Sequence, residues 1–320
     1  MEPVPAERVR MDVDGRGIWL TDLDRVLFES GYTKAEVVDY YLGVAGVLLP
    51  HLAGRPLTVV RFPDGVAAGG FFAENAPAGT PSWVRRASLA TSDGDVEHGD
   101  VEHGDLKHGD IEHVVVESRA ALAWLANTSA VELHTPPWTV QPNGSPAGYD
   151  RLVIDLDPGS GAGIPECAML AMTLREALAE VGLDAVAKTS VAAGMHLLEP
   201  VTPTPAQDAV GFVRGLAEAL ADATPELATT RTGERERSGR VLLDWRQNMS
   251  GATTVAPYSL RAGHSPGVST PITWDEVAAA AAGMELAFDP NTMRERILTR
   301  GDLASALLVD ERPTLPSTAG

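Results

Sequence analysis

Apolar and polar positions along the chain follow two periods, one typical of helices and one typical of strands. Apolar stripes at helical spacing predict helices over 33–49 and 120–127. Short apolar runs predict strands over 57–62 and 114–116. Thr33 and Glu36 have the spacing of a capping box, which places the start of the first helix.

The second half of the chain repeats both patterns after a turn-rich linker at 141–150. Strands are predicted over 152–156, 186–190, 195–201 and 241–245. Helices are predicted over 165–181, 206–221 and 273–282, the last with a cap at Thr273 and Glu276. Because strands and helices do not alternate strictly, an α+β fold is favoured over a doubly wound sheet. We expect one domain over 1–305 and a flexible tail over 306–320.

An acidic pentapeptide repeat interrupts this pattern. It reads DVEHG, DVEHG, DLKHG, DIEH within an insert at about 93–113. A period of five matches neither a helix nor a strand, so we expect a solvated loop or an extension of a hairpin. The alternative is a transition-metal site, because each copy pairs a histidine with nearby carboxylates. The four histidines are His98, His103, His108 and His113.

The charge of the chain limits its partners. Among 320 residues, 25 are Lys or Arg and 44 are Asp or Glu, a formal net charge of −19. Such a protein repels nucleic acid at long range, so a nucleic-acid function must depend on local basic patches or metal ions. A hydrophobic content of 44% argues against disorder.

Targeting signals are not recognisable in the sequence. No run of about 18 apolar residues predicts a membrane span, and the N-terminal residues lack the apolar stretch of a signal peptide. The single cysteine, Cys167, excludes an intrachain disulfide. We therefore expect a cytoplasmic protein without membrane contact.

The sharpest local feature is the segment LVIDLDPG. Residues two apart in a strand share a face, so Ile154 and Leu156 are expected in the core and Asp155 and Asp157 side by side on the opposite face. Two neighbouring carboxylates repel each other unless a cation or proton intervenes, which suits Mg²⁺ or Mn²⁺. Two solvated aspartates at a turn are the structural alternative. The same D-x-D pattern also occurs in sugar transferases and phosphatases.

Two other segments could complete a site. Asp244 ends an apolar strand, and if it joins the first two acids they can hold one or two divalent ions. In KTSVAAGMH, the Ser190 hydroxyl, the backbone near Gly194 and the His196 imidazole could cradle phosphate oxygens. An exposed aspartate and a buried hairpin histidine are the structural alternatives.

Aromatic residues offer a further binding surface. Phe71 and Phe72 follow a flexible glycine turn and could stack on bases, although at least one ring is expected to be buried in the core. His134 precedes the rigid pair Pro136 and Pro137.

In this order, the segments resemble the polymerase domain of bacterial ligase D, a member of the archaeo-eukaryotic primase superfamily that works in non-homologous end joining. The resemblance runs from about Thr21 to Leu303 through LDRVLF, GRPLTVVRFPDGV, FFAENAP, ELHTPPW, RLVIDLDPG, KTSVAAGMHL, VLLDWRQN, TTVAPYSLRA and STPITWDEV. It implies a primase-polymerase type α+β fold. Such a fold has a central, mostly antiparallel sheet and a catalytic groove between two sheet-containing subdomains flanked by helices.

The resemblance also implies roles for individual residues. The metal-binding and catalytic carboxylates would be Asp155, Asp157 and Asp244. The incoming nucleotide would be held by His134, Ser190, His196, Gln247 and Arg261. Phe71 and Phe72 would stack on the template, and Arg25 and Lys34 would hold the 5′-phosphate across a gap or break.

Several departures from the family pattern remove phosphate contacts. Asp22 replaces an Asn, and Val191 replaces a Gly. Lysines are replaced at Val60, Glu74, Ala193 and Ala252. Each lost contact lowers affinity for DNA and flattens its dependence on salt.

The resemblance implies a template-directed nucleotidyltransferase that fills gaps or extends ends in double-strand break repair, with a preference for ribonucleotides. It would use two Mn²⁺ or Mg²⁺ ions, nucleoside triphosphates, and DNA ends, gaps or primer-templates. A DNA ligase and a Ku-type protein would act in trans. The alternative is a catalytically weak or inactive module of the same fold that binds DNA ends or repair partners.

Overall fold

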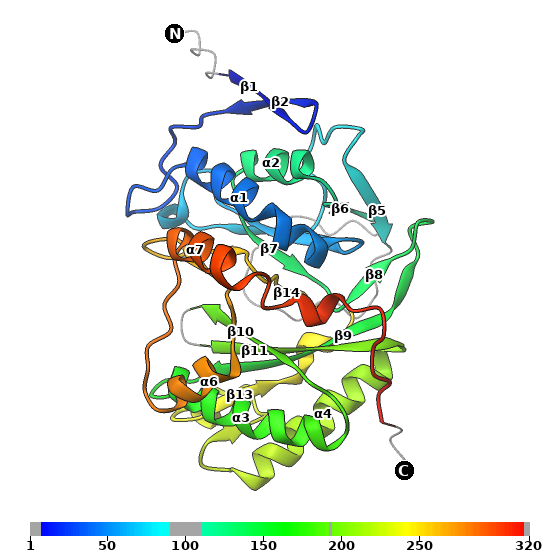
Figure 1. The fold of residues 1–320 in the computed structure, drawn as a ribbon, viewed down its shortest axis with the longest axis vertical. Helices are drawn as coiled ribbons and strands as arrows, with labels where there is room; N and C mark the ends of the chain where they lie inside the picture. Colours follow the sequence, from blue (N-terminus) through cyan, green and yellow to red (C-terminus); the bar gives the residue numbers. More distant parts are fainter. Residues whose placement is uncertain (1–7, 90–109, 192–193, 317–320) are drawn as a thin grey trace.

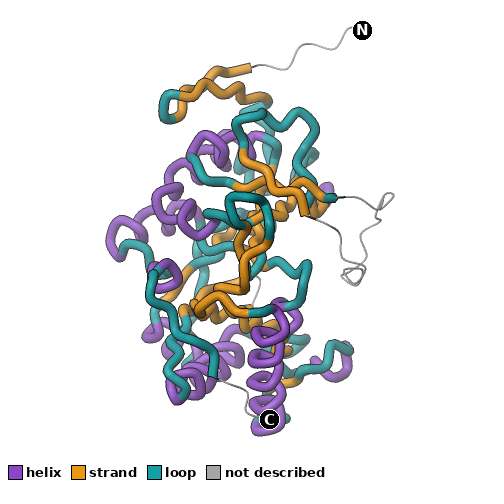
Figure 2. The backbone as a smooth tube through the Cα atoms, turned by 90° about the vertical axis from the view of Figure 1, so that its right-hand side faces the viewer, coloured by secondary structure: helices purple, strands orange, loops and turns teal. Residues whose placement is uncertain are grey.

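The structure of the protein, a computed structural model, describes residues 8–89, 110–191 and 194–316. Two β-sheets with helices against them form two lobes along the long axis of the molecule (Figure 1). In the orthogonal view, strands follow one another down the middle of the molecule (Figure 2). A small hairpin of β1 (Arg8–Val13) and β2 (Arg16–Thr21) lies at the N-terminal end.

The first lobe is built on a six-stranded sheet with the order β14-β7-β3-β6-β5, and β4 pairs with β3. Its strands are β3 (Pro56–Arg61), β4 (Phe71–Ala73), β5 (Arg85–Leu89), β6 (Ile111–Val115), β7 (Ala130–Thr135) and β14 (Thr254–Val255). Its helices are α1 (Lys34–Leu52), α2 (Arg119–Asn127) and α7 (Pro290–Arg300). The capping box of Thr33 and Glu36 is present at the start of α1.

The second lobe is built on a seven-stranded sheet with the order β12-β13-β9-β11-β10-β17, and β8 pairs with β9. Its strands are β8 (Trp138–Val140), β9 (Pro146–Pro158), β10 (Val186–Val191), β11 (Gly194–Thr204), β12 (Ala228–Thr229), β13 (Val241–Asp244) and β17 (Pro271–Ile272). Its helices are α3 (Ile164–Glu180), α4 (Ala206–Ala223), α5 (Glu234–Arg237) and α6 (Trp274–Ala281). Apart from the parallel pair β12 and β13, its strands pair antiparallel, which confirms the α+β prediction.

Alternation along β9 decides which side chains face the first lobe. Ile154 and Leu156 are buried in the core of the second lobe, together with residues of α3 and α4. Val153 belongs instead to the core of the first lobe. Because side chains alternate along a strand, Asp155 and Asp157 share the face of Val153, as the sequence predicted.

Three segments add detail to the sequence-based expectations. The linker is shorter than predicted, because a tight turn over 141–145 leads directly into β9, where Tyr149 pairs with Trp138. The last copy of the repeat begins β6, which pairs antiparallel with β5; residues 93–109 lie outside the described residues. In the expected tail, the Pro313 carbonyl accepts a hydrogen bond from the Thr202 amide. Residues 317–320 lie outside the described residues.

Shorter elements complete the described chain. They are β15 (Leu260–Arg261), β16 (Gly267–Val268) and the 3₁₀ helices η1 (Val66–Ala68), η2 (Trp245–Asn248) and η3 (Ser305–Leu308). In the described residues, no helix is long and apolar enough to cross a membrane.

Candidate functional site

The pairing of β9 with β13 brings the three predicted aspartates together. Asp244 lies directly opposite Asp155, and Leu242 lies opposite Asp157. Opposite residues in an antiparallel pair share a face and have Cα atoms about 4.5–5.5 Å apart. The three carboxylates therefore lie on one face of two adjacent strands.

Two of these acids contact residues that the sequence also singled out. Nε2 of His196 on β11 lies 3.3 Å from Oδ1 of Asp155. The amide nitrogen of Gln247 donates to Oδ2 of Asp244 over 3.2 Å, and Arg246 donates to its Oδ1 over the same distance. Gln247 is close to the acids because η2 begins directly after β13.

Asp157 has a different environment. Burial raises its pKa above the ordinary value, Arg237 opposes this rise, and the charges of Asp155 and Asp244 add to it. Arg237 donates to Oδ2 of Asp157 over 2.6 Å. In the described part of the chain, no three His, Cys, Asp or Glu side chains form a ready-made metal site. Arginines supply positive charge beside two of the acids, Arg237 beside Asp157 and Arg246 beside Asp244.

The hairpin of β10 and β11 places two more polar side chains on this face. Lys188 pairs with His196 across the two strands, and its ammonium group donates to Ser269 over 2.8 Å. Burial lowers the pKa of His196 to about 4, and the charge of Lys188 adds to this effect. A Cβ atom on Gly194 would lie 2.5 Å from Oγ of Ser190, so only glycine fits beside that hydroxyl.

The first lobe contributes a second cluster, which contains a residue that sequence reasoning missed. Glu132 on β7 accepts hydrogen bonds from Nε2 of His134 over 3.0 Å and from Arg261 over 2.7 Å. Its other oxygen accepts from the Ala262 amide over 2.8 Å. The ring of Phe72 meets the His134 ring edge-on at 5.5 Å. The available signal was the spacing of two in ELH, which puts Glu132 and His134 on one face of a strand.

Electrostatic effects connect the two lobes. Burial lowers the pKa of both Lys188 and His196 on the second sheet, and the positive charge of Arg261 from the first cluster adds to this effect. Burial also lowers the pKa of His134, and the charge of Lys188 adds to that effect. The structure thus brings the predicted metal and nucleotide residues near one another between the lobes.

The predicted stacking pair lies at the rim of the first lobe. Phe71 and Phe72 are 40% and 55% exposed, so the expectation that at least one ring is buried was wrong. Both lie on the short strand β4, which pairs only with β3 among the described strands. The guanidinium of Arg61 lies 5.6 Å from the centre of the Phe71 ring.

The two residues predicted to bind the 5′-phosphate, Arg25 and Lys34, lie next to each other, and carboxylates lie close to Arg25. The Lys34 amide donates to the Arg25 carbonyl over 2.8 Å. The Arg25 guanidinium lies 3.9 Å from the carboxylates of Asp22 and Asp64 and donates to the Pro63 carbonyl. Lys34 is only 4% exposed, and burial lowers its pKa.

Two of the substituted lysine positions lie inside the protein. Val60 and Ala252 are buried, whereas Glu74 is exposed. Ala193 lies outside the described residues.

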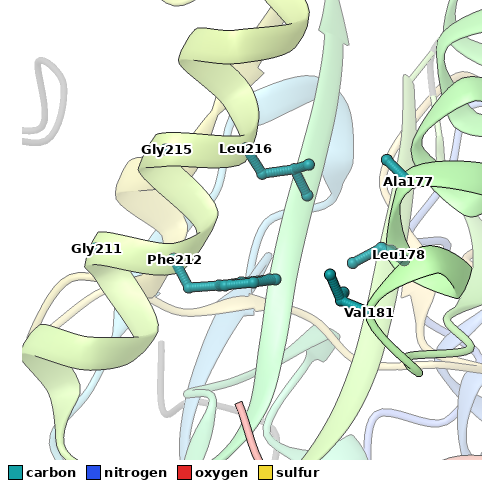
Figure 3. A pocket seen from close by; sticks show the side chains of 7 residues that line it. All are labelled: Ala177, Leu178, Val181, Gly211, Phe212, Gly215 and Leu216. Carbon is teal, nitrogen blue, oxygen red and sulfur yellow. The ribbon is translucent and has the colours of Figure 1, made fainter. Parts of the chain in front are cut away.

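An apolar pocket lies elsewhere, between α3 and α4 on the helical side of the second sheet (Figure 3). Phe212 and Leu216 of α4 line it together with Leu178 and Val181. None of its lining side chains carries a polar group, so it is not a candidate site for the chemistry considered above.

The architecture and the converging acids define a primase-polymerase type domain. The chain belongs to the LigD primase-polymerase domain family, whose sequence profile matches residues 33–304. It is 37% identical over 293 residues to a multifunctional non-homologous end joining protein LigD of Mycolicibacterium smegmatis. It is 31% identical over 284 residues to a bifunctional LigD protein of Bacillus subtilis.

These matches cover 91% and 88% of this chain but only 36% and 42% of the relatives. A solved structure is also similar, namely the polymerase domain from Mycobacterium tuberculosis ligase D in complex with DNA. It aligns with a TM-score of 0.82 and 35% identity, over 92% of this chain and 98% of that one. The family places the chain among polymerase domains of end-joining DNA repair proteins.

Proposed function

We propose that this protein is a template-directed nucleotidyltransferase that adds nucleotides, preferably ribonucleotides, at DNA ends or gaps during double-strand break repair. The observation that carries the proposal is the shared face of Asp155, Asp157 and Asp244 on β9 and β13. Membership of the LigD primase-polymerase family supports it. A DNA ligase and a Ku-type protein would be its partners in repair.

The three carboxylates would bind a pair of Mg²⁺ or Mn²⁺ ions. Carboxylate oxygens are the hard ligands that these cations prefer. Burial raises the pKa of Asp157, Arg237 opposes this rise, and the charges of Asp155 and Asp244 add to it, so a bound cation would reduce the repulsion among the three acids. Bound ions would neutralise triphosphate charge and lower the pKa of the primer 3′-hydroxyl.

Other residues of the chain would bind and orient the substrates. Arg261 and Gln247 offer donors to the nucleotide, and Ser190 offers a hydroxyl beside the glycine turn. The exposed Phe71 and Phe72 would stack on template bases. The lone, buried Cys167 suits a reducing, cytoplasmic location.

Primer extension with Mn²⁺ tests the proposal. The wild type should extend a primer on a DNA template, with ATP used better than dATP, and Asp155→Ala/Asp157→Ala should not extend it. Asp222→Ala, an exposed aspartate of α4 outside the candidate site, is the matched control. Equal extension by the wild type and the double variant would exclude this assignment of the site.

The carboxylates close to Arg25 favour a second function, which is binding of DNA ends or repair partners without catalysis. Asp22 and Asp64 lie beside Arg25, and the valine and alanine at positions 60 and 252 add no charge for phosphate. A module that binds DNA ends or repair partners without catalysis would have these features. Binding of a nucleoside triphosphate that is stimulated by Mn²⁺ supports the polymerase, whereas DNA binding without it supports the module.

A further inference from the structure

Glu132 lies on β7, next to the candidate nucleotide-binding residues His134 and Arg261, and is not among the site residues predicted from the sequence. It is buried, and its two oxygens accept three hydrogen bonds, from His134, Arg261 and the Ala262 amide. Burial would raise its pKa, but the bond from His134 and the charge of Arg261 outweigh that effect and lower it. Glu132 is therefore an anion at neutral pH.

The contact with an anion fixes the proton on His134. A carboxylate only accepts hydrogen bonds, so Nε2 of His134, 3.0 Å from Glu132, must carry a hydrogen. Burial lowers the pKa of His134 against the pull of Glu132, which keeps the ring neutral at pH 7. Its Nδ1 is then unprotonated and can accept a hydrogen bond but not donate one.

The same carboxylate also fixes Arg261. One terminal nitrogen of its guanidinium donates to Glu132 over 2.7 Å, while its Nε is buried without a hydrogen-bond partner in the described structure. A buried donor without an acceptor is costly. An oxygen of a bound anion would satisfy it.

We propose that Glu132 is the positioning residue of the nucleotide site, holding His134 as an acceptor and Arg261 as a donor toward a bound nucleoside triphosphate. The proposal rests on the proposed function for the identity of the ligand. Glu132 itself need not touch the nucleotide. It acts by fixing one proton and one guanidinium in place, which reduces the freedom that both side chains lose on binding.

The test compares wild type, Glu132→Gln and Glu199→Gln. Glutamine keeps the size of Glu132 but replaces one acceptor with a donor that opposes His134 and Arg261. Glu199 is the matched control, because it is a buried glutamate of β11 that pairs with Leu152 on the helical side of the sheet. The measurements are the Kd for ATP with Mn²⁺, primer-extension kinetics, thermal unfolding, and the ¹⁵N chemical shifts of His134.

In Glu132→Gln we expect the Kd and KM for ATP to rise roughly ten- to hundredfold, because charge-assisted hydrogen bonds are lost, with a smaller change in kcat. Glu199→Gln should bind ATP like the wild type. Unchanged ATP affinity in a folded Glu132→Gln would overturn the proposal. If that variant does not fold, the ¹⁵N shifts of the wild type decide: a proton on Nε2 supports the proposal, and one on Nδ1 overturns it.

The same measurements distinguish failure of the proposed polymerase function from failure of the proposed role of Glu132. ATP binding that depends on Glu132, without any primer extension, would overturn the polymerase assignment but support the role of Glu132. A wild type that binds no ATP with Mn²⁺ would overturn both.

Discussion

The buried carboxyl of Glu199 should make the stability of this protein depend on pH in a way that one substitution removes. Glu199 is 1% exposed, and its Oε2 has no hydrogen-bond partner in the described structure. Burial raises its pKa from 4.5 to about 7; a hydrogen bond from the Asp184 backbone opposes the rise, and the charge of Asp184 adds to it. The folded protein therefore binds this proton more tightly than the unfolded chain does.

The sign and size of the effect follow from that difference. Since the folded-state pKa is the higher one, this group makes the protein less stable as pH rises from about 4.5 to about 7. Between pH 5 and pH 8 the loss is about 2.5 kcal/mol, because one pKa unit corresponds to about 1.36 kcal/mol. Glu199→Gln has no such proton to lose.

Denaturant unfolding of wild type and Glu199→Gln at pH 5 and pH 8 measures this effect. Other titrating groups are common to both proteins, so the difference between the two free energies of unfolding isolates residue 199. The variant should gain about 2.5 kcal/mol relative to wild type when the pH is raised from 5 to 8. A difference that stays constant across this range would refute the reasoning about burial.

Three further changes test other parts of the structure. Glu276→Gln should lower the free energy of unfolding by about 2 kcal/mol at pH 7 and by less below pH 4.5, as measured by denaturant unfolding. Burial raises the pKa of Glu276, but the hydrogen bonds from Arg296 outweigh burial and lower it to about 2, and partial exposure to solvent reduces the energy that this shift represents. Phe72→Ala should weaken binding of a single-stranded template overhang roughly tenfold without changing the Tm, and exposed Leu298→Ala serves as control; equal losses in both would contradict a stacking role. Arg25→Ala should lower the salt dependence of binding to 5′-phosphorylated gapped DNA by about one unit of log–log slope; an unchanged slope would remove Arg25 from the phosphate contacts.

Local patterns in the sequence were sufficient to predict five helices, α1, α2, α3, α4 and α6, and six strands, β3, β6, β9, β10, β11 and β13. The capping boxes at Thr33 and Thr273 begin α1 and α6, because the side-chain bonds that define them involve residues only three apart. The alternation in LVIDLDPG placed Ile154 in the core and Asp155 on the other face. Such features depend on a few consecutive residues.

The sequence patterns did not predict elements whose residues favour turns or are mostly polar. The start of β9 carries Pro146 and Gly148, which favour loops, yet pairing with β8 makes this segment a strand. Helix α7 is polar along most of its length, so no apolar stripe marked it. The exposure of Phe71 and Phe72 depends on β4 pairing with β3 at the rim of the lobe, which local pattern does not show.

By itself, the sequence determined the strongly patterned helices and strands, the acidic charge of the chain and the choice of three aspartates as candidate metal ligands, because these follow from residue types, short periods and the resemblance of the motifs to a family. Only the tertiary structure decided that Asp244 lies opposite Asp155, and that Arg261 donates a hydrogen bond to Glu132. These contacts join residues about 90 and 130 positions apart in the chain. Their formation depends on strand register and on the packing of two lobes, which many weak long-range interactions set together.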